Sequence, residues 1–146
     1  MLDKKTIDIV KSTVPAIRAQ GLEITSVFYK TMFERNPEVK SFFNMDKQDS
    51  GEQPKALALT ILAAAQNIDN LEAIIPVAKR IGEIHCRLNI KPEHYPIVGE
   101  NLLIAIKEVL GAVATDEIID AWGQAYGVIA EVFINIEKEM YAEINK

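Results

Sequence analysis

The stretch IGEIHCRL, residues 81–88, decides the fold, because it sets His85 within a run of apolar residues at helical spacing. Ile81, Ile84 and Leu88 recur around the histidine, so the pattern predicts a helix whose apolar face carries the imidazole. The chain has one other histidine, His94. A neutral imidazole facing a core is either a hydrogen-bonded structural histidine or a ligand for something apolar and metal-bearing. The surrounding pattern has to decide between these two interpretations.

Apolar residues recur at helical spacing through nearly the whole chain. Ile7, Val10, Val14 and Ile17, for example, make one stripe near the amino terminus. No segment shows the alternation of a strand with turn signals at both ends. The sequence therefore predicts an all-α fold.

Capping and breaking residues predict where the helices begin and end. Asp3 precedes a first helix, in which Pro15 is expected to cause an irregularity and Gly21 to act as the stop. Polar residues 44–52 are expected to form a loosely ordered loop before the next long helix. The other helices are expected at about 22–35, from Pro37 to about 43, around Leu57–Leu62, from a capping box at 69–72, from Pro92 or Pro96 to about 110, and from Thr115 to about 143.

The length of 146 residues suits one domain with a buried core, so a single domain over residues 1–146 is expected. The formal net charge of −5 argues against a nucleic-acid partner, which would need clustered Lys and Arg. The longest uncharged run, residues 56–68, is too short to span a bilayer, so no transmembrane segment is expected. The amino terminus carries no apolar secretory signal, so we expect a cytoplasmic protein.

Glu137 is a second anomaly, because Phe133, Met140 and Tyr141 surround its carboxylate at helical spacing. Burying an unpaired carboxylate is expensive, so Glu137 either reaches water at the edge of the stripe or has a partner inside. Tyr95 is a candidate to donate a hydrogen bond to it. Such a carboxylate can also accept the ring N–H of a metal-bound His85, which is the usual arrangement around a ligating histidine.

Tyr29, Gln53 and Leu57 form a third group of candidate residues. Tyr29 lies in an aromatic cluster, where core filling with the hydroxyl at the rim is the commoner role, and Gln53 and Leu57 share one helical face. Together with an axial histidine and a short helix ending in a Phe-Phe pair, they match a haem slot with a proximal and a distal side. The lone Cys86 and the absence of a Cys-x-x-Cys-His motif mean that such a haem b would be held non-covalently.

These features extend to a family resemblance over almost the whole chain. The sequence resembles the bacterial haemoglobins of the flavohaemoglobin class, and most closely the single-domain, Vitreoscilla-type haemoglobins, whose fold is the globin fold, a 3-on-3 helical sandwich. The stretches that carry the resemblance are Met1-Leu2-Asp3, Phe28-Tyr29, Asn36-Pro37-Glu38, Gln53-Pro54-Lys55-Ala56-Leu57, His85, His94-Tyr95-Pro96-Ile97-Val98-Gly99 and Asp120-Ala121-Trp122-Gly123-Gln124-Ala125-Tyr126-Gly127-Val128.

The resemblance implies a role for each candidate residue. His85 resembles the proximal iron ligand, with Tyr95 and Glu137 as its hydrogen-bonded partners, so His94 is expected to be dispensable for the iron. Phe43 resembles the aromatic residue that stacks on the porphyrin, and Val98 a residue that contacts the haem. The distal pocket is expected to be formed by Tyr29, Gln53 and Leu57, and Tyr29 is expected to be the main hydrogen-bond donor to a bound gas.

Two departures from the family pattern matter. Many relatives have a lysine before the proximal histidine that reaches a haem propionate, whereas this chain has Ile84. In this chain the propionate contact is expected to come from Lys79, Arg80 or Arg87, or to be absent. The chain also ends at Lys146, so the flavin and nicotinamide domains of flavohaemoglobins are not expected, and electrons should come from a separate reductase.

Two functions follow from the resemblance, and the sequence does not choose between them. The protein carries and delivers O2 reversibly, or it detoxifies nitric oxide as a dioxygenase. The alternatives are a haem-based gas sensor, a redox protein without turnover, the truncated globin domain of a flavohaemoglobin, and a helical module with no haem. The last leaves His85, Tyr95 and Glu137 unexplained. The resemblance also allows a homodimer, although the sequence shows no interface.

Overall fold

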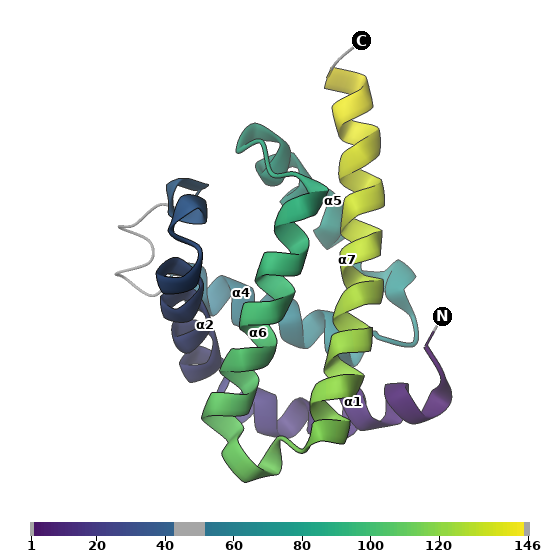
Figure 1. Ribbon diagram of the computed structural model, residues 1–146. Helices are drawn as coiled ribbons and strands as arrows, with labels where there is room; N and C mark the ends of the chain where they lie inside the picture. The colour runs from purple at the N-terminus through teal and green to yellow at the C-terminus, as the bar shows by residue number, and fades with distance from the viewer. Residues whose placement is uncertain (1, 43–51, 145–146) are drawn as a thin grey trace.

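The computed structural model describes residues 2–42 and 52–144, with only the backbone of residues 52–54. The described residues form helices joined by short turns, and none of them is in a strand (Figure 1). The elements are α1 (Lys4–Ala19), α2 (Gly21–Arg35), η1 (Pro37–Phe42), α4 (Glu52–Gln66), η2 (Leu71–Ile74), α5 (Ile75–Arg87), η3 (Pro92–His94), α6 (Tyr95–Leu110), η4 (Gly111–Val113) and α7 (Asp116–Ile144), the η elements being 3₁₀ turns. The predicted all-α fold is confirmed.

The helices pack in two layers. One layer holds α1, α4 and α5, and the other holds α2, α6 and α7. Between the layers α1 and α5 pack against α7, and α2 packs against α4, while α2 and α6 lie side by side in their own layer (Figure 1). This arrangement places α5, which carries His85, directly against α7, which carries Glu137.

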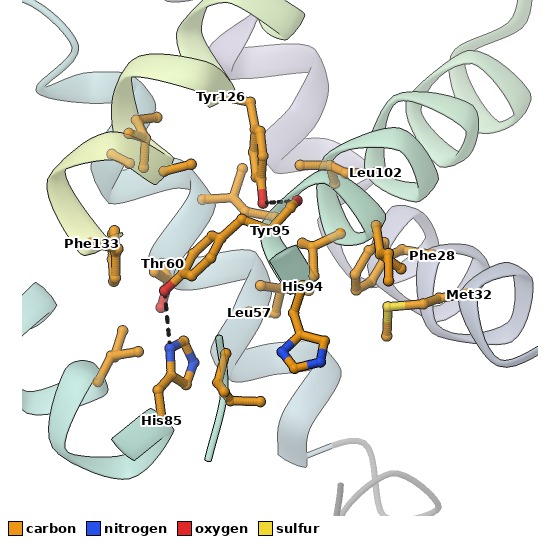
Figure 2. A pocket seen from close by; sticks show the side chains of 18 of the residues that line it. Phe28, Met32, Leu57, Thr60, His85, His94, Tyr95, Leu102, Tyr126 and Phe133 are labelled. Carbon is orange, nitrogen blue, oxygen red and sulfur yellow. Dashed lines mark hydrogen bonds between the residues drawn. The ribbon is translucent and has the colours of Figure 1, made fainter. Parts of the chain in front are cut away.

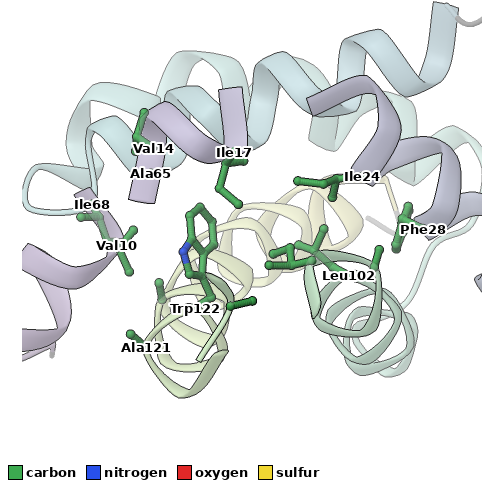
Figure 3. Close-up of a cluster of buried hydrophobic side chains, with 14 of the residues drawn as sticks. Val10, Val14, Ile17, Ile24, Phe28, Ala65, Ile68, Leu102, Ala121 and Trp122 are labelled. Atoms are coloured by element: carbon green, nitrogen blue, oxygen red, sulfur yellow. The ribbon is translucent and has the colours of Figure 1, made fainter. Parts of the chain in front are cut away.

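The core lies where α1, α2, α6 and α7 meet (Figure 3). Val10, Ile24 and Phe28 are at most 2 % exposed, and Trp122 extends from α7 toward α1. The indole Nε1 of Trp122 donates a hydrogen bond of 2.8 Å to Thr13 Oγ1, so its buried N–H is satisfied. Phe28 and Trp122 also line the cavity described below, so the core borders it.

The predicted helix ends are confirmed where a capping side chain is local. Asp3 accepts a hydrogen bond of 2.8 Å from the Thr6 backbone N–H at the start of α1, and Thr115 Oγ1 accepts one of 3.3 Å from Ile118 before α7. Pro15 lies inside α1, which continues through it to Ala19. Pro92 opens η3, whereas Pro96 lies in the first turn of α6.

Two sequence predictions of helix ends are wrong. Gly21 does not stop a helix, because it is the first residue of α2, where a Cβ atom would lie 3.5 Å from Ala58 Cβ of α4. The capping box at 69–72 does not form, since the Asp69 carboxylate binds Lys11 Nζ at 2.7 Å instead. The chain then makes the η2 turn and begins α5 at Ile75.

No helix within the described part of the chain combines the length and apolar character that crossing a membrane requires.

Candidate functional site

A cavity of about 490 Å³ lies between the two layers at the end occupied by α5 (Figure 2). Its walls come from α2, η1, α4, α5, α6 and α7, and most of the lining side chains are aliphatic or aromatic. The volume falls within the range of cofactor sites, about 300–1,000 Å³. The polar, basic and indole side chains among the described lining residues are Tyr29, Thr60, Arg80, His85, His94, Tyr95, Trp122 and Tyr126, and none is acidic.

His85 reaches the cavity from the last turn of α5, next to Ile81 and Val77. The side of α5 that packs on α7 carries Ala78 and Gly82, both buried. The sequence pattern predicted that Ile84 and Leu88 share a buried face with His85. This prediction is wrong, because their side chains are 46 % and 41 % exposed. Neither is among the described residues that line the cavity.

Two side chains, those of Glu137 and Tyr95, meet on the outer side of the His85 ring. Glu137 Oε2 lies 3.0 Å from His85 Nδ1 and 2.6 Å from the Tyr95 hydroxyl, and the hydroxyl is 3.1 Å from Nδ1. The carboxylate oxygen accepts from both groups, so the histidine proton resides on Nδ1. The lone pair of Nε2 is then available on the side of the cavity, which is what a metal-binding imidazole requires.

Glu137 is 3 % exposed, so its charge is compensated by partners rather than by water. The sequence left open whether Glu137 reaches water or has a partner inside the protein, and the structure shows the partner inside. The approach of α7 to α5 depends on Gly82, where a Cβ atom would lie 3.3 Å from Glu137 Cγ and 3.2 Å from Met140 Sδ. A Cβ atom at this position would therefore press on both side chains, which would have to move by a few tenths of an ångström.

Tyr95 is held at both ends. Burial and its hydrogen bond to Glu137 raise the pKa of the Tyr95 hydroxyl well above its ordinary value, so the phenol stays protonated and donates. Its backbone carbonyl accepts a hydrogen bond of 2.7 Å from the Tyr126 hydroxyl, as Figure 2 shows. Tyr126 packs against Gly99 of α6, where a Cβ atom would lie 2.6 Å from its ring.

Tyr126 and Tyr141 were missed as site residues in the sequence. The Tyr141 hydroxyl donates to the Ile90 carbonyl at 2.5 Å and lies 3.5 Å from the His85 carbonyl, so it fixes the segment that follows α5. Both tyrosines lie on the apolar stripe of α7, as Phe133 and Glu137 do. That stripe was the only available signal, because their hydrogen-bond partners are distant in sequence.

The structure places three further predicted residues at the cavity. Tyr29 is 8 % exposed and packs edge-on against Phe28, with ring centroids 4.9 Å apart. Leu57 of α4 and Val98 of α6 also line the cavity. Phe43, residues 44–51 of the loop predicted over 44–52, and the side chain of Gln53 lie outside the described residues. The predicted loop is one residue too long at its end, because Glu52 is the first residue of α4.

Lys79, Arg80 and Arg87, the candidates to contact a haem propionate in place of the lysine that Ile84 replaces, differ in their relation to the cavity. All three are exposed on α5, but Arg80 is among the described residues that line the cavity and Lys79 and Arg87 are not. His94 also lines it, from the η3 turn.

The lining residues fit a haem group. A flat apolar macrocycle needs apolar walls and one imidazole whose Nε2 faces inward, and the cavity supplies both through the residues around His85. The carboxylate–histidine pair behind the ring is the arrangement that orients a metal ligand.

Comparisons with known proteins agree with this geometry. The sequence profile of the family described as Globin matches residues 26–133. A flavohemoprotein from Oceanobacillus iheyensis is 59 % identical over 143 residues, which are 98 % of this chain and 35 % of that protein. The chain thus spans about a third of the length of the curated relatives it matches.

Two solved structures are similar over all or nearly all of their length. A bacterial globin from Campylobacter jejuni has a TM-score of 0.92 at 48 % identity, covering 96 % of this chain and 99 % of that one. An engineered carbene transferase from Rhodothermus marinus, described as a proposed nitric oxide dioxygenase, has a TM-score of 0.92 at 34 % identity and covers both chains completely. The predicted resemblance and the predicted globin fold are confirmed.

Proposed function

The chain belongs to the globin family, and from that premise we propose that it is a haem-binding, gas-binding globin whose site is built for nitric oxide dioxygenation. The observation that carries the proposal is the buried Glu137 carboxylate on His85 Nδ1. A neutral acceptor would serve to orient the ring, whereas a carboxylate also gives the imidazole anionic character.

The cofactor is haem b, held non-covalently, with His85 Nε2 as the ligand from the chain. Haem supplies iron that binds diatomic gases and exchanges single electrons. The aliphatic and aromatic walls exclude water from it, and Leu57 and Val98 are among the residues that contact the macrocycle. Phe43, whose structure lies outside the described residues, is proposed as a stacking aromatic on the basis of the resemblance alone.

The His85 side of the site controls the ligand strength of the imidazole. Glu137 Oε2 keeps the ring proton on Nδ1 and raises the basicity of Nε2, while the Tyr95 hydroxyl shares the same oxygen and limits its charge. A stronger donor nitrogen favours oxidised and oxygen-activated states of the metal. This favours dioxygenation over simple storage of O2.

Tyr29 is proposed as the hydrogen-bond donor to the gas. It enters the cavity from α2, whereas His85 enters from α5, and its hydroxyl is a neutral donor in a largely apolar wall. A donor aimed at developing negative charge in a dry site stabilises that charge strongly. Gln53 is a second donor, proposed from the resemblance because its side chain lies outside the described residues.

The reaction consumes one NO, one O2 and one electron and produces one nitrate. We therefore propose an electron-donating reductase as a partner, together with a cytoplasmic location where reduced nicotinamides are available. The description of the Rhodothermus marinus protein as a proposed nitric oxide dioxygenase supports this reaction class. Reversible O2 carriage is the second candidate, because Tyr29 would also retain O2.

The decisive experiment measures NO consumption and nitrate formation by the reduced protein in air-saturated buffer with a supplied flavin reductase. The proposal expects one nitrate per NO over many turnovers, with Glu137→Gln slower than wild type and Glu139→Gln, an exposed position on the same helix, unchanged. A single nitrate per haem without turnover, despite active reductase, would favour the carrier instead.

A further inference from the structure

The charge of the cavity lining differs from that of the whole chain. The sequence has 21 acidic and 16 basic residues, yet the described lining carries Arg80, His85 and His94 and no carboxylate. His85 is accounted for by Glu137, so Arg80 and His94 are left as basic groups at an otherwise apolar cavity. Such a wall complements a ligand that is apolar in its body and anionic at its edge.

The orientation of the His94 ring is fixed. Its Nδ1 accepts a hydrogen bond of 2.8 Å from the Lys91 backbone N–H, and its ring lies edge-on to Phe42, with centroids 4.9 Å apart. Because Nδ1 is an acceptor, the proton of the neutral ring is on Nε2. That N–H has no hydrogen-bond partner among the described residues, and Figure 2 shows His94 among the side chains that line the cavity.

Arg80 supplies a full positive charge. Its guanidinium makes no ion pair with the described residues, and Arg80 lies about one and a half turns before His85 along α5. Arg80 is exposed, as Lys79 and Arg87 on the same helix are, but of these three only Arg80 is among the described residues that line the cavity. The exposed Ile84 side chain offers no donor.

We infer that His94 and Arg80 form a carboxylate subsite that binds the propionate groups of haem. The inference rests on the proposed haem function and adds to it, since it assigns the second histidine to the edge of the cofactor and not to its iron. His94 Nε2–H donates a hydrogen bond to one carboxylate oxygen, and Arg80 compensates the charge. The apolar walls then contact only the macrocycle.

The test measures the rate of haem loss from each holoprotein to an excess of a haem scavenger. Each protein is reconstituted either with haem or with haem dimethyl ester, which lacks free carboxylates. His94→Asn keeps an acceptor near Nδ1 for Lys91 but removes the distant donor, whereas His94→Gln places an amide donor near the position of Nε2. Arg80→Gln removes the charge, and Arg87→Gln is its matched control on the exposed face of α5.

The inference expects His94→Asn and Arg80→Gln to speed loss of haem about tenfold, the usual effect of one hydrogen bond to a charged group. His94→Gln should restore a slow rate, and Arg87→Gln should match wild type. The ester should leave wild type and all variants at the same rate. The ferrous spectrum should not change in any of them.

Three results would overturn it. Equal acceleration for haem and its ester would mean that the variants only loosen packing, and no acceleration for either would mean that the groups do not touch the carboxylates. A changed ferrous spectrum in His94→Asn would make His94 an iron ligand. Failure of the haem proposal itself would be visible separately, as wild-type protein that takes up no haem, and would overturn this inference with it.

Discussion

Glu137 is the residue on which the chemistry of the site depends most, because one of its oxygens serves both His85 and Tyr95 at hydrogen-bond distance. Its burial at 3 % exposure makes the interaction strong, since little water competes for the carboxylate. The sequence identified all three residues, because a carboxylate on an apolar stripe needs a partner and Tyr95 and His85 were the polar candidates.

Changing Glu137→Gln should raise the reduction potential of the bound iron, because the imidazole loses its anionic acceptor. A rise of about 60 mV corresponds to one factor of ten in a one-electron equilibrium. Spectroelectrochemical titration measures it, with Glu139→Gln as the exposed control on the same helix. An unchanged potential would leave Glu137 with a purely structural role.

Tyr29→Phe removes one hydroxyl from the cavity wall and leaves the ring packed against Phe28. We expect O2 dissociation to accelerate about ten- to a hundredfold, the effect of losing a hydrogen bond to a charged acceptor. Stopped-flow displacement of O2 by CO measures this rate. A rate equal to that of wild type would exclude Tyr29 as the donor.

The Tyr29 and Glu137 effects should be nearly additive in the double variant, because the two residues share no hydrogen-bond partner among those that the structure gives for Glu137. Strong coupling would mean that the two sides of the cavity act through one common group.

At the scale of elements, the site is a product of how α5, α6 and α7 approach one another. Gly82 lets α7 bring Glu137 to α5, and Gly99 lets the Tyr126 ring lie on α6, where its hydroxyl holds the Tyr95 carbonyl. The two glycines thus set the positions of Tyr95 and Glu137 from opposite sides.

Gly99→Ala should destabilise the protein by about 1–3 kcal/mol, the usual cost of overpacking, because the new Cβ would lie 2.6 and 2.8 Å from Tyr126 ring atoms. Gly127→Ala is the control, since a Cβ there meets nothing within 4 Å and should stabilise α7 by about 0.5–1 kcal/mol. Urea denaturation compares the two variants. Equal stabilities would show that Tyr126 moves away at no cost.

Three tyrosines that connect these helices should resist ionisation. Burial raises the pKa of Tyr95, Tyr126 and Tyr141 above the ordinary value of 10.0, and nearby groups add to the shift for Tyr95 and Tyr141. Because the folded pKa values are higher than those of the unfolded chain, their contribution to stability is complete below pH 10 and is lost as the pH rises further.

Absorbance at 295 nm during an alkaline titration measures this effect. These three tyrosines should ionise only as the helical circular dichroism is lost, whereas all 4 in the chain should titrate near pH 10 in guanidinium. Full ionisation at pH 10 with the helices intact would contradict the packing described for α6 and α7.

The sequence was informative about helix ends where the capping group is local and failed where a distant residue competes. Asp3 and Thr115 cap their own helices, but Asp69 is taken by Lys11, which is 58 positions away. Likewise, the helical spacing of apolar residues could not by itself show that Ile84 and Leu88 are exposed while His85 faces the cavity. The contacts of Tyr126 and His94 depend on which helices become neighbours, and no local pattern contains that information.

At the scale of the whole molecule, the two layers leave a cavity of about 490 Å³ where α4, α5, α6 and α7 do not close on one another. A cavity of this size lined with apolar groups is costly unless a ligand fills it, because the lining atoms lose packing contacts. The fold therefore gains stability from its cofactor, and among the described lining residues only His85 combines an inward nitrogen with a buried carboxylate behind it.

The most direct test of the central claim is the haem content and ferrous absorption spectrum of wild type, His85→Ala and His94→Ala, each purified under the same haem supply. We expect one haem per chain and a five-coordinate histidine-ligated spectrum in wild type and His94→Ala, with both lost in His85→Ala. A wild-type spectrum and haem content in His85→Ala, together with their loss in His94→Ala, would contradict the account.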